Sequence, residues 1–214
     1  MLGIPEDEPC NFTHQNRGVT LALIRHGQTD WNAQGRFQGR IDVPLNDLGR
    51  QQARDTAAAL AEAHTEWEAV VSSPLSRARE TAEIIAERLG LPLGEAMDEW
   101  VERSYGVYEG AEEAPELKTH PSVEKLGSVI MRGYGGLARV ERDYPRQNVL
   151  VVAHGTIIRY TLNDIMGGHP EDPLVPRILN GALSTLRQAD RLSAEGSIAW
   201  HVLQLNVSPS AARV

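Results

Sequence analysis

Two histidines stand at corresponding places in the chain, each just beyond a short apolar run and directly before glycine. His26 follows residues 19–24, and His154 follows residues 148–153. Runs of this length and composition predict buried strands. Because ligands collect beyond the carboxyl ends of the strands in an open α/β sheet, we expect both imidazoles at one site.

A third segment joins a strand to a helix at residues 72–78, with the sequence SSPLSRA. Arg77 falls in the first turn of the predicted helix, where a cation opposes the helix dipole unless an anion is bound nearby. Arg25, which precedes the first histidine, supplies a second guanidinium. These four groups together predict a phosphate pocket.

Phosphoryl transfer is the chemistry that such a set could perform. The transferred group spreads negative charge over three equatorial oxygens, which two arginines and one histidine can neutralise. The other histidine can attack phosphorus if its ring is neutral, and nearby arginines would lower its pKa and favour that state. Its second ring nitrogen then needs an orienting acceptor such as a backbone carbonyl. Glu102, within residues 98–106, is the carboxylate that we select as proton donor for the departing alkoxide.

Each residue also has a structural interpretation when it is considered alone. A single histidine is at least as often a hydrogen-bonded core residue as a catalyst, and a lone RHG tripeptide is weak evidence. Arg77 alone would be a solvated helix residue and Glu102 a surface acid. The hypothesis therefore depends on the three motifs occurring together at successive strand ends.

The segments around these motifs alternate between strand and helix patterns. Beyond the two apolar runs, strands are expected at residues 69–71, 183–188 and 198–205. Helices are expected from the Asn46 cap to Leu60, from a Ser73 cap with Pro74 in the first turn to Leu89, from about residue 122 to 144, and from 154–156 to the glycines at 167 and 168. Gly90 is expected to end the second of these helices in a left-handed conformation. The alternation predicts an α/β fold, a three-layer sandwich with a mostly parallel central sheet and helices on both faces.

Composition limits the organisation and the partners. The chain has 214 residues with 41% hydrophobic content, which favours one domain, and we assign it to residues 19–206 between a loosely ordered extension at 1–18 and a tail at 207–214. A formal net charge of −8 argues against nucleic acid and anionic membranes as partners. The single cysteine, Cys10, cannot form an intramolecular disulfide, and the chain shows no signal-peptide core or membrane span. A cytoplasmic protein is expected.

The motifs resemble the histidine phosphatase superfamily, specifically its phosphoglycerate-mutase-like branch, from about Leu21 to Leu186. The resemblance rests on five segments: LIRHGQTDWN at 23–32, RFQGRIDVPLNDLGRQQA at 36–53, SSPLSRARETA at 72–82, ERSYGVYEG at 102–110 and VVAHG at 151–155. It implies the fold described above and an enzyme that needs neither a metal nor another cofactor.

The resemblance also implies roles for individual residues. His26 would be phosphorylated, Arg25, Arg77 and His154 would hold the phosphoryl oxygens, and Glu102 would donate a proton and then activate water. Asn32 and the segment Gln38–Gly39 match positions that line the phosphate or the transferred group in the family. Thr29, in the same loop, and Gly155, directly after His154, are further candidate binding residues. Arg103 and Tyr105 follow Glu102 as they do in the cofactor-dependent mutases, where they help to bind a sugar acid.

Within the family a phosphatase acting on a small phosphorylated substrate is favoured. The segment 110–149 is short and lacks the adjacent arginine pair with which mutases grip the far end of the substrate. Several of its dispersed basic residues are interpreted as a solvated helix face; the six are Lys118, Lys125, Arg132, Arg139, Arg142 and Arg146. The acids Glu109, Glu112, Glu113 and Glu116 are interpreted most simply as a solvated loop, and alternatively as a rim of the pocket that repels polyanionic substrates.

Three other readings stay open. One is a mutase primed by bisphosphoglycerate, and another is a phosphate-binding module without catalysis. A zinc enzyme is the weakest, because arginines flank the two histidines and no Asp or Cys ligand spacing is present. The sequence identifies neither the substrate nor whether the chain forms a homodimer.

Overall fold

The computed structural model describes residues 19–63, 65–192 and 198–209, and in this part of the chain six strands form one sheet. The strands are β1 (Thr20–Arg25), β2 (Ala69–Ser72), β3 (Leu93–Ala96), β4 (Val149–Ala153), β5 (Leu183–Leu192) and β6 (Ile198–Val207), in the order β3-β2-β4-β1-β5-β6. The first four strands run parallel, whereas β5 is antiparallel to β1 and β6 is antiparallel to β5. The predicted mostly parallel sheet is confirmed.

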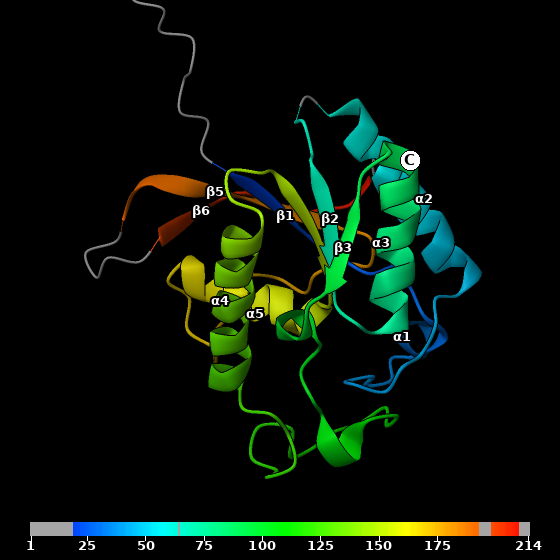
Figure 1. The fold of residues 1–214 in the computed structure, drawn as a ribbon. Helices are drawn as coiled ribbons and strands as arrows, with labels where there is room; N and C mark the ends of the chain where they lie inside the picture. Colours follow the sequence, from blue (N-terminus) through cyan, green and yellow to red (C-terminus); the bar gives the residue numbers. More distant parts are fainter. Residues whose placement is uncertain (1–18, 64, 193–197, 210–214) are drawn as a thin grey trace, which may run out of the picture.

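Helices cover both faces of this sheet, as the three-layer prediction requires (Figure 1). The helices α2 (Asp47–Glu62) and α3 (Ser76–Leu89) lie on one face, and α4 (Leu126–Asp143) and α5 (Gly155–Ile165) lie on the other. Side chains of β1 alternate between the two layers, with Ile24 in the α2–α3 core and Leu23 in the α4–α5 core. Short helical segments complete the described elements: α1 (Asp30–Ala33), η1 (Asp98–Trp100) and η2 (Gly106–Tyr108).

Most predicted boundaries agree with the structure, but the start of α3 was predicted wrongly. Asn46 caps α2 by accepting the Gly49 N–H, and Gly90 ends α3 with φ +65°, both as expected. However, α3 begins at Ser76, two residues after the start at Pro74 that the predicted Ser73 cap implied. The carboxylate of Asp42 accepts the Ser76 N–H at 2.8 Å, so a distant loop supplies the cap that local sequence assigned to Ser73.

The glycines in α4 allow close packing and do not interrupt the helix. A Cβ atom on Gly133 would lie 1.9 Å from the hydroxyl of Thr161 in α5, and one on Gly136 would lie 2.6 Å from the Trp100 ring. The helix therefore lies directly against both neighbours. The strand β3 and the four-residue helix α1 were not predicted, because each is short.

Gly27, the residue after His26, lies where the loop following β1 meets the first turn of α2. A Cβ atom at this position would lie 2.2 Å from the carbonyl oxygen of Gly49. Backbone cannot move aside as a flexible side chain can, so any larger residue would push this loop away from α2.

Gly27→Ala should therefore lower the free energy of unfolding by about 1–3 kcal/mol, the usual cost of overpacking. Gly127→Ala is the matched control, since Gly127 lies exposed in α4 with no atom near its added methyl group. That variant should be neutral or more stable by up to about 1 kcal/mol, because alanine favours helix. Urea denaturation measures the free energy of unfolding of both variants. If Gly27→Ala were as stable as Gly127→Ala, the packing argument would be contradicted.

The ends of the chain lie largely outside the described residues. The extension predicted for residues 1–18 falls outside them entirely. The predicted tail begins at Val207, which is the last residue of β6, and residues 210–214 are not described. Within the described helices, none is both long and apolar enough to span a bilayer.

Candidate active site

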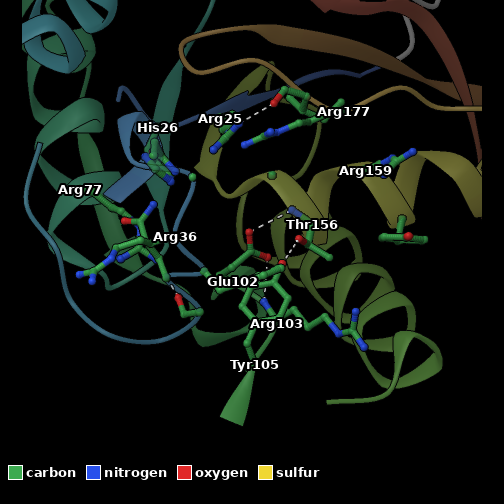
Figure 2. Close-up of a pocket in the computed structure, with 18 of the residues that line it drawn as sticks. Arg25, His26, Arg36, Arg77, Glu102, Arg103, Tyr105, Thr156, Arg159 and Arg177 are labelled. Atoms are coloured by element: carbon green, nitrogen blue, oxygen red, sulfur yellow. Dashed lines mark hydrogen bonds between the residues drawn. The ribbon is translucent and has the colours of Figure 1, made fainter. Parts of the chain in front are cut away.

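A cavity of about 310 Å³ lies at the carboxyl end of β1 and at the start of α5, and ten of the twelve predicted site residues line it (Figure 2). They are Arg25, His26, Asn32, Gln38, Gly39, Arg77, Glu102, Arg103, Tyr105 and Gly155. The other two, Thr29 and His154, are fully buried beside this group. Segments that are far apart in sequence thus converge as expected.

His26 has the hydrogen bonding that an attacking imidazole needs. Its side chain is 2% exposed, and Nδ1 lies 2.6 Å from the carbonyl oxygen of Gly27. A carbonyl can only accept, so Nδ1 carries the proton and Nε2 keeps its lone pair. Burial, followed by the charges of Arg77 and Arg25, holds the pKa of His26 well below its usual range. The ring is therefore neutral, and the expected backbone acceptor is present.

His154 lies next to His26, with ring centroids 5.1 Å apart. Its Nε2 lies 2.8 Å from the hydroxyl oxygen of Ser73, and its Nδ1 has no partner within the described part of the chain. Burial and the charge of Arg77 lower the pKa of His154 well below the ordinary value. Both histidines are thus held neutral in the folded protein.

These two lowered pKa values predict a stability that depends on pH. An unfolded histidine has a pKa of about 6.5, so the unfolded chain takes up protons first as the pH falls. The free energy of unfolding should decrease below that pH, until the lowered folded-state pKa is reached, by up to about 1.4 kcal/mol per pH unit for each histidine. Urea denaturation between pH 7.5 and 5 measures the slope. His26→Asn should make it shallower, whereas an unchanged slope would show that His26 is not held neutral.

Arg25 and Arg77 are fixed by backbone carbonyls. Arg25 Nη1 donates to the carbonyl of Ile178 at 2.6 Å, and Arg77 donates to those of Ile41 and Gly39, each at 2.8 Å. Burial lowers the pKa of Arg25 to about 10, so it stays charged at neutral pH. In both arginines Nε has no acceptor among the described residues, which leaves hydrogen-bonding capacity for a bound anion.

Glu102 is oriented by three backbone N–H groups. Oε1 accepts from Arg103 at 2.8 Å and from Ile157 at 3.2 Å, and Oε2 accepts from Thr156 at 3.0 Å. Thr156 and Ile157 belong to the first turn of α5, whose free N–H groups need acceptors. The carboxyl group is therefore held at the cavity wall in one orientation.

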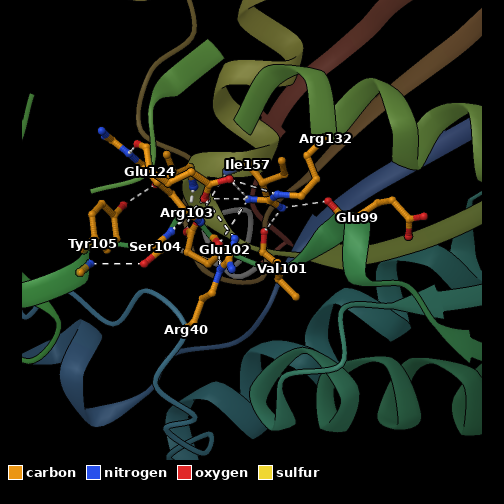
Figure 3. A network of polar contacts seen from close by, with 12 residues as sticks. Arg40, Glu99, Val101, Glu102, Arg103, Ser104, Tyr105, Glu124, Arg132 and Ile157 are labelled. Carbon is orange, nitrogen blue, oxygen red and sulfur yellow. Dashed lines mark hydrogen bonds and ion pairs between the residues drawn. The ribbon is translucent and has the colours of Figure 1, made fainter. Parts of the chain in front are cut away.

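A polar network behind Glu102 fixes the segment that carries it (Figure 3). Arg132 of α4 donates to the backbone carbonyls of Glu99 and Val101 and forms an ion pair with Glu124 at 3.1 Å. Arg132, one of the six basic residues of which several were interpreted as a solvated helix face, is therefore not part of such a face. Glu109 was also misassigned to a solvated loop, because its carboxylate accepts the N–H of Tyr105 at 3.1 Å and braces the same segment.

The remaining predicted residues divide into lining and supporting groups. The hydroxyl of Thr29 donates to Gln38 at 2.9 Å and accepts the N–H of Asn32 at 3.2 Å, so Thr29 supports two lining residues and does not itself line the cavity. Tyr105 shares a 2.6 Å hydrogen bond with the hydroxyl of Thr156. Burial raises the pKa of Tyr105, which keeps its hydroxyl protonated.

Several lining residues were not predicted. They are Gly35, Arg36, Phe37, Leu117, Thr156, Arg159, Tyr160, Arg177 and Ile178. Arg36 and Phe37 lie inside the motif segment 36–53, and Thr156 directly follows the segment 151–155. Arg159 lies one helical turn after Gly155, so helical periodicity could have found it. Arg177 lies in the loop between α5 and β5 and carries no sequence signal.

No group of three or more metal-ligating side chains occurs in the part of the chain that the structure describes. The donors around the cavity are mainly guanidinium groups, which cannot ligate a metal ion. The residues present fit a bound phosphate better than a zinc ion.

Comparison with known proteins agrees with this geometry. Residues 21–195 match the family model described as the histidine phosphatase superfamily, branch 1. An uncharacterized phosphatase, PhoE, of Bacillus subtilis is 40% identical over 195 residues, covering 89% of this chain and 95% of its own. Phosphoglycerate mutase-like protein 4 of Arabidopsis thaliana is 31% identical, covering 79% and 80%. A mycobacterial glucosyl-3-phosphoglycerate phosphatase solved with VO3 superimposes with a TM-score of 0.76 at 26% identity, covering 89% of this chain and all of its own.

Proposed function

The chain belongs to the histidine phosphatase superfamily, branch 1, and from this membership we propose that it hydrolyses a small phosphomonoester through a phosphohistidine on His26. One observation carries the proposal. A neutral imidazole with its Nδ1 proton tied to a carbonyl lies in a cavity that also holds two fixed guanidinium groups and an oriented carboxyl.

In the first step, Nε2 of His26 attacks phosphorus and the bond to the ester oxygen breaks. Arg25, Arg77 and His154 hold the equatorial oxygens, whose negative charge increases in the transition state. Glu102, in its protonated form, transfers its proton to the departing alkoxide. The products of this step are the free alcohol and a phosphorylated His26.

In the second step, the Glu102 carboxylate removes a proton from a water molecule. The water oxygen attacks phosphorus, and the bond between phosphorus and Nε2 breaks. Inorganic phosphate leaves, while His26 is again neutral and Glu102 again protonated. No metal ion is needed, because arginine side chains supply the positive charge.

The other lining residues have binding roles in this proposal. Asn32, Gln38, Gly39 and Gly155 contact the phosphoryl group or its ester oxygen, and Arg103 and Tyr105 contact the rest of the substrate. Thr29 acts through Gln38 and Asn32. We further propose that residues 19–206 act as one domain and that the protein is cytoplasmic, consistent with its single cysteine.

A bisphosphoglycerate-primed mutase is the alternative, favoured by Arg103 and Tyr105 in the cavity and by the mutase-like relative. Incubation with 3-phosphoglycerate, with and without 2,3-bisphosphoglycerate, separates the two activities. A phosphatase releases inorganic phosphate without primer and forms no 2-phosphoglycerate. Primer-dependent formation of 2-phosphoglycerate would establish the mutase, and loss of all activity in EDTA would contradict the metal-free mechanism.

A further inference from the structure

The cavity has an excess of positive charge over what one phosphoryl group requires. Six arginines line it, and Glu102 is the one carboxylate among the described lining residues. The chain as a whole has a formal net charge of −8. Several arginines elsewhere, such as Arg50 and Arg139, are paired with carboxylates. Of the six lining arginines, Arg36 pairs with Glu112 at 3.8 Å, and the other five have no ion pair among the described residues. Five unpaired guanidinium groups around one cavity of an acidic protein indicate a ligand with more than one anionic group.

Four of the lining arginines already have a role: Arg25 and Arg77 hold the phosphoryl group, Arg36 pairs with Glu112, and Arg103 donates to the carbonyl of Glu124. Arg159 and Arg177 are the remaining two. Within the described residues, neither has an acidic side chain within ion-pair distance. Arg159 donates Nε to the carbonyl of Val175 at 2.8 Å, which leaves both of its terminal nitrogens free. The guanidinium of Arg177 has no hydrogen-bond acceptor in the described chain, and this side chain is exposed at the cavity.

The backbone that carries Arg177 is held in place on both sides. Asn206 donates to the carbonyl of Arg177 at 3.0 Å and accepts the N–H of Leu179 at 2.8 Å. Arg25 donates to the carbonyl of the intervening Ile178 at 2.6 Å. The backbone at Arg177 is therefore held by Asn206, and the residue after it, Ile178, orients the phosphate-binding Arg25.

Arg177 is near enough to Arg25 for the two like charges to repel. Figure 2 shows their guanidinium groups side by side, with Arg159 on the adjoining part of the wall. The charge of Arg177 contributes to the lowered pKa of Arg25, although burial is the larger cause. Like charges held together in this way are stabilised when an anion lies between or beside them.

We infer that Arg159 and Arg177 form a subsite for a second anionic group of the substrate, a carboxylate or a second phosphate. The preferred substrates are then small phosphomonoesters that carry a further anion a short distance from the ester. A cavity of about 310 Å³ suits a molecule of this size. The inference rests on the proposed function, because that function places the ester phosphate at His26, Arg25 and Arg77.

Two matched substrate pairs test it. We compare kcat/KM for 3-phosphoglycerate with glycerol 3-phosphate, and for fructose 1,6-bisphosphate with fructose 6-phosphate. A preference of about tenfold or more for the doubly anionic member is expected in at least one pair, as a charge-assisted hydrogen bond supplies that much discrimination. The pair that shows the preference identifies the second group. Ratios near one in both pairs would overturn the inference.

Substitutions of Arg159 and Arg177 test whether these two side chains cause the preference for doubly anionic substrates. Arg177→Gln and Arg159→Gln should bring the ratio toward one, mainly by raising KM for the doubly anionic substrate, and Arg177→Lys should restore part of it. Arg54→Gln is the control, because Arg54 lies exposed on α2 with Gln51 as its partner, and it should leave the ratio unchanged. A preference that survives both glutamine variants would also overturn the inference.

Calorimetry separates this inference from the proposed function. The His26→Ala protein, which should not turn over substrate, is titrated with each member of the two pairs. Tighter binding of a doubly anionic member that depends on Arg177 supports the subsite, even if the wild-type protein were to hydrolyse nothing. Hydrolysis of a simple aryl phosphate without any preference in binding would leave the proposed function standing and remove the subsite.

Discussion

His26→Ala should reduce phosphate release from 4-nitrophenyl phosphate by about 10⁴-fold or more, since removal of a nucleophile leaves only binding and charge stabilisation. The methyl group of alanine has no lone pair with which to attack phosphorus. The cradle formed by Arg25 and Arg77 remains in place, because both are held by backbone carbonyls and not by the imidazole. Steady-state kinetics gives the loss, and circular dichroism verifies that the fold is retained.

A chemical readout identifies the intermediate directly. Wild-type protein mixed with labelled substrate and quenched in alkali should retain a phosphoryl label that acid removes, whereas His26→Ala should retain none. His201→Ala is the matched control, because His201 is exposed on β6, and it should behave as wild type. Appreciable turnover or labelling in His26→Ala would remove this residue from its proposed role.

Glu102→Gln should slow hydrolysis of an alkyl phosphate by about 10²–10⁴-fold, the usual effect of losing a general acid. The amide oxygen can still accept the N–H groups of Arg103 and Ile157, which keep the side chain near its place, while the hydrogen bond from the Thr156 N–H is lost because the amide nitrogen cannot accept. A 4-nitrophenolate leaves without protonation, so formation of the phosphoenzyme from the aryl ester should be much less impaired. Hydrolysis of the phosphoenzyme still needs a base, so the phosphoenzyme should accumulate.

Rapid mixing with 4-nitrophenyl phosphate tests this contrast. The Glu102→Gln protein should give a burst of 4-nitrophenolate close to one equivalent, followed by slow turnover. Glu113→Gln, which changes an exposed acid in the nearby loop, should match wild type. Equal losses on the alkyl and aryl esters, with no burst, would show that Glu102 is neither the acid nor the base.

The elements and motifs that local sequence could define were predicted correctly. The apolar runs before His26 and His154 became β1 and β4, which are parallel neighbours in the sheet. Neighbouring parallel strands bring their carboxyl ends together, so the two imidazoles had to lie close to each other. The Asn46 cap and the left-handed Gly90 were equally predictable, because each depends on residues within one helical turn.

Features that depend on distant partners were missed or misassigned. The start of α3 is determined by Asp42, which lies 34 residues before Ser76 in the chain. Arg132 matched the pattern of a solvated helix face, yet it braces the Glu102 segment through backbone carbonyls 30 to 33 residues away. A backbone acceptor leaves no mark in the sequence, so no local pattern could have identified these contacts.

The sequence by itself determined which residue types would stand at the strand ends, and these residue types imply the phosphate chemistry. It could do so because hydrophobic periodicity, helix capping and motif spacing are properties of neighbouring residues. Only the tertiary structure decided the tautomer of His26, the orientation of Glu102 by the first turn of α5, and the entry of Arg177 into the cavity. Each of these depends on where a carbonyl, an N–H group or a loop lies in space after folding. Long-range packing determines such positions, and the order of amino acids does not display them.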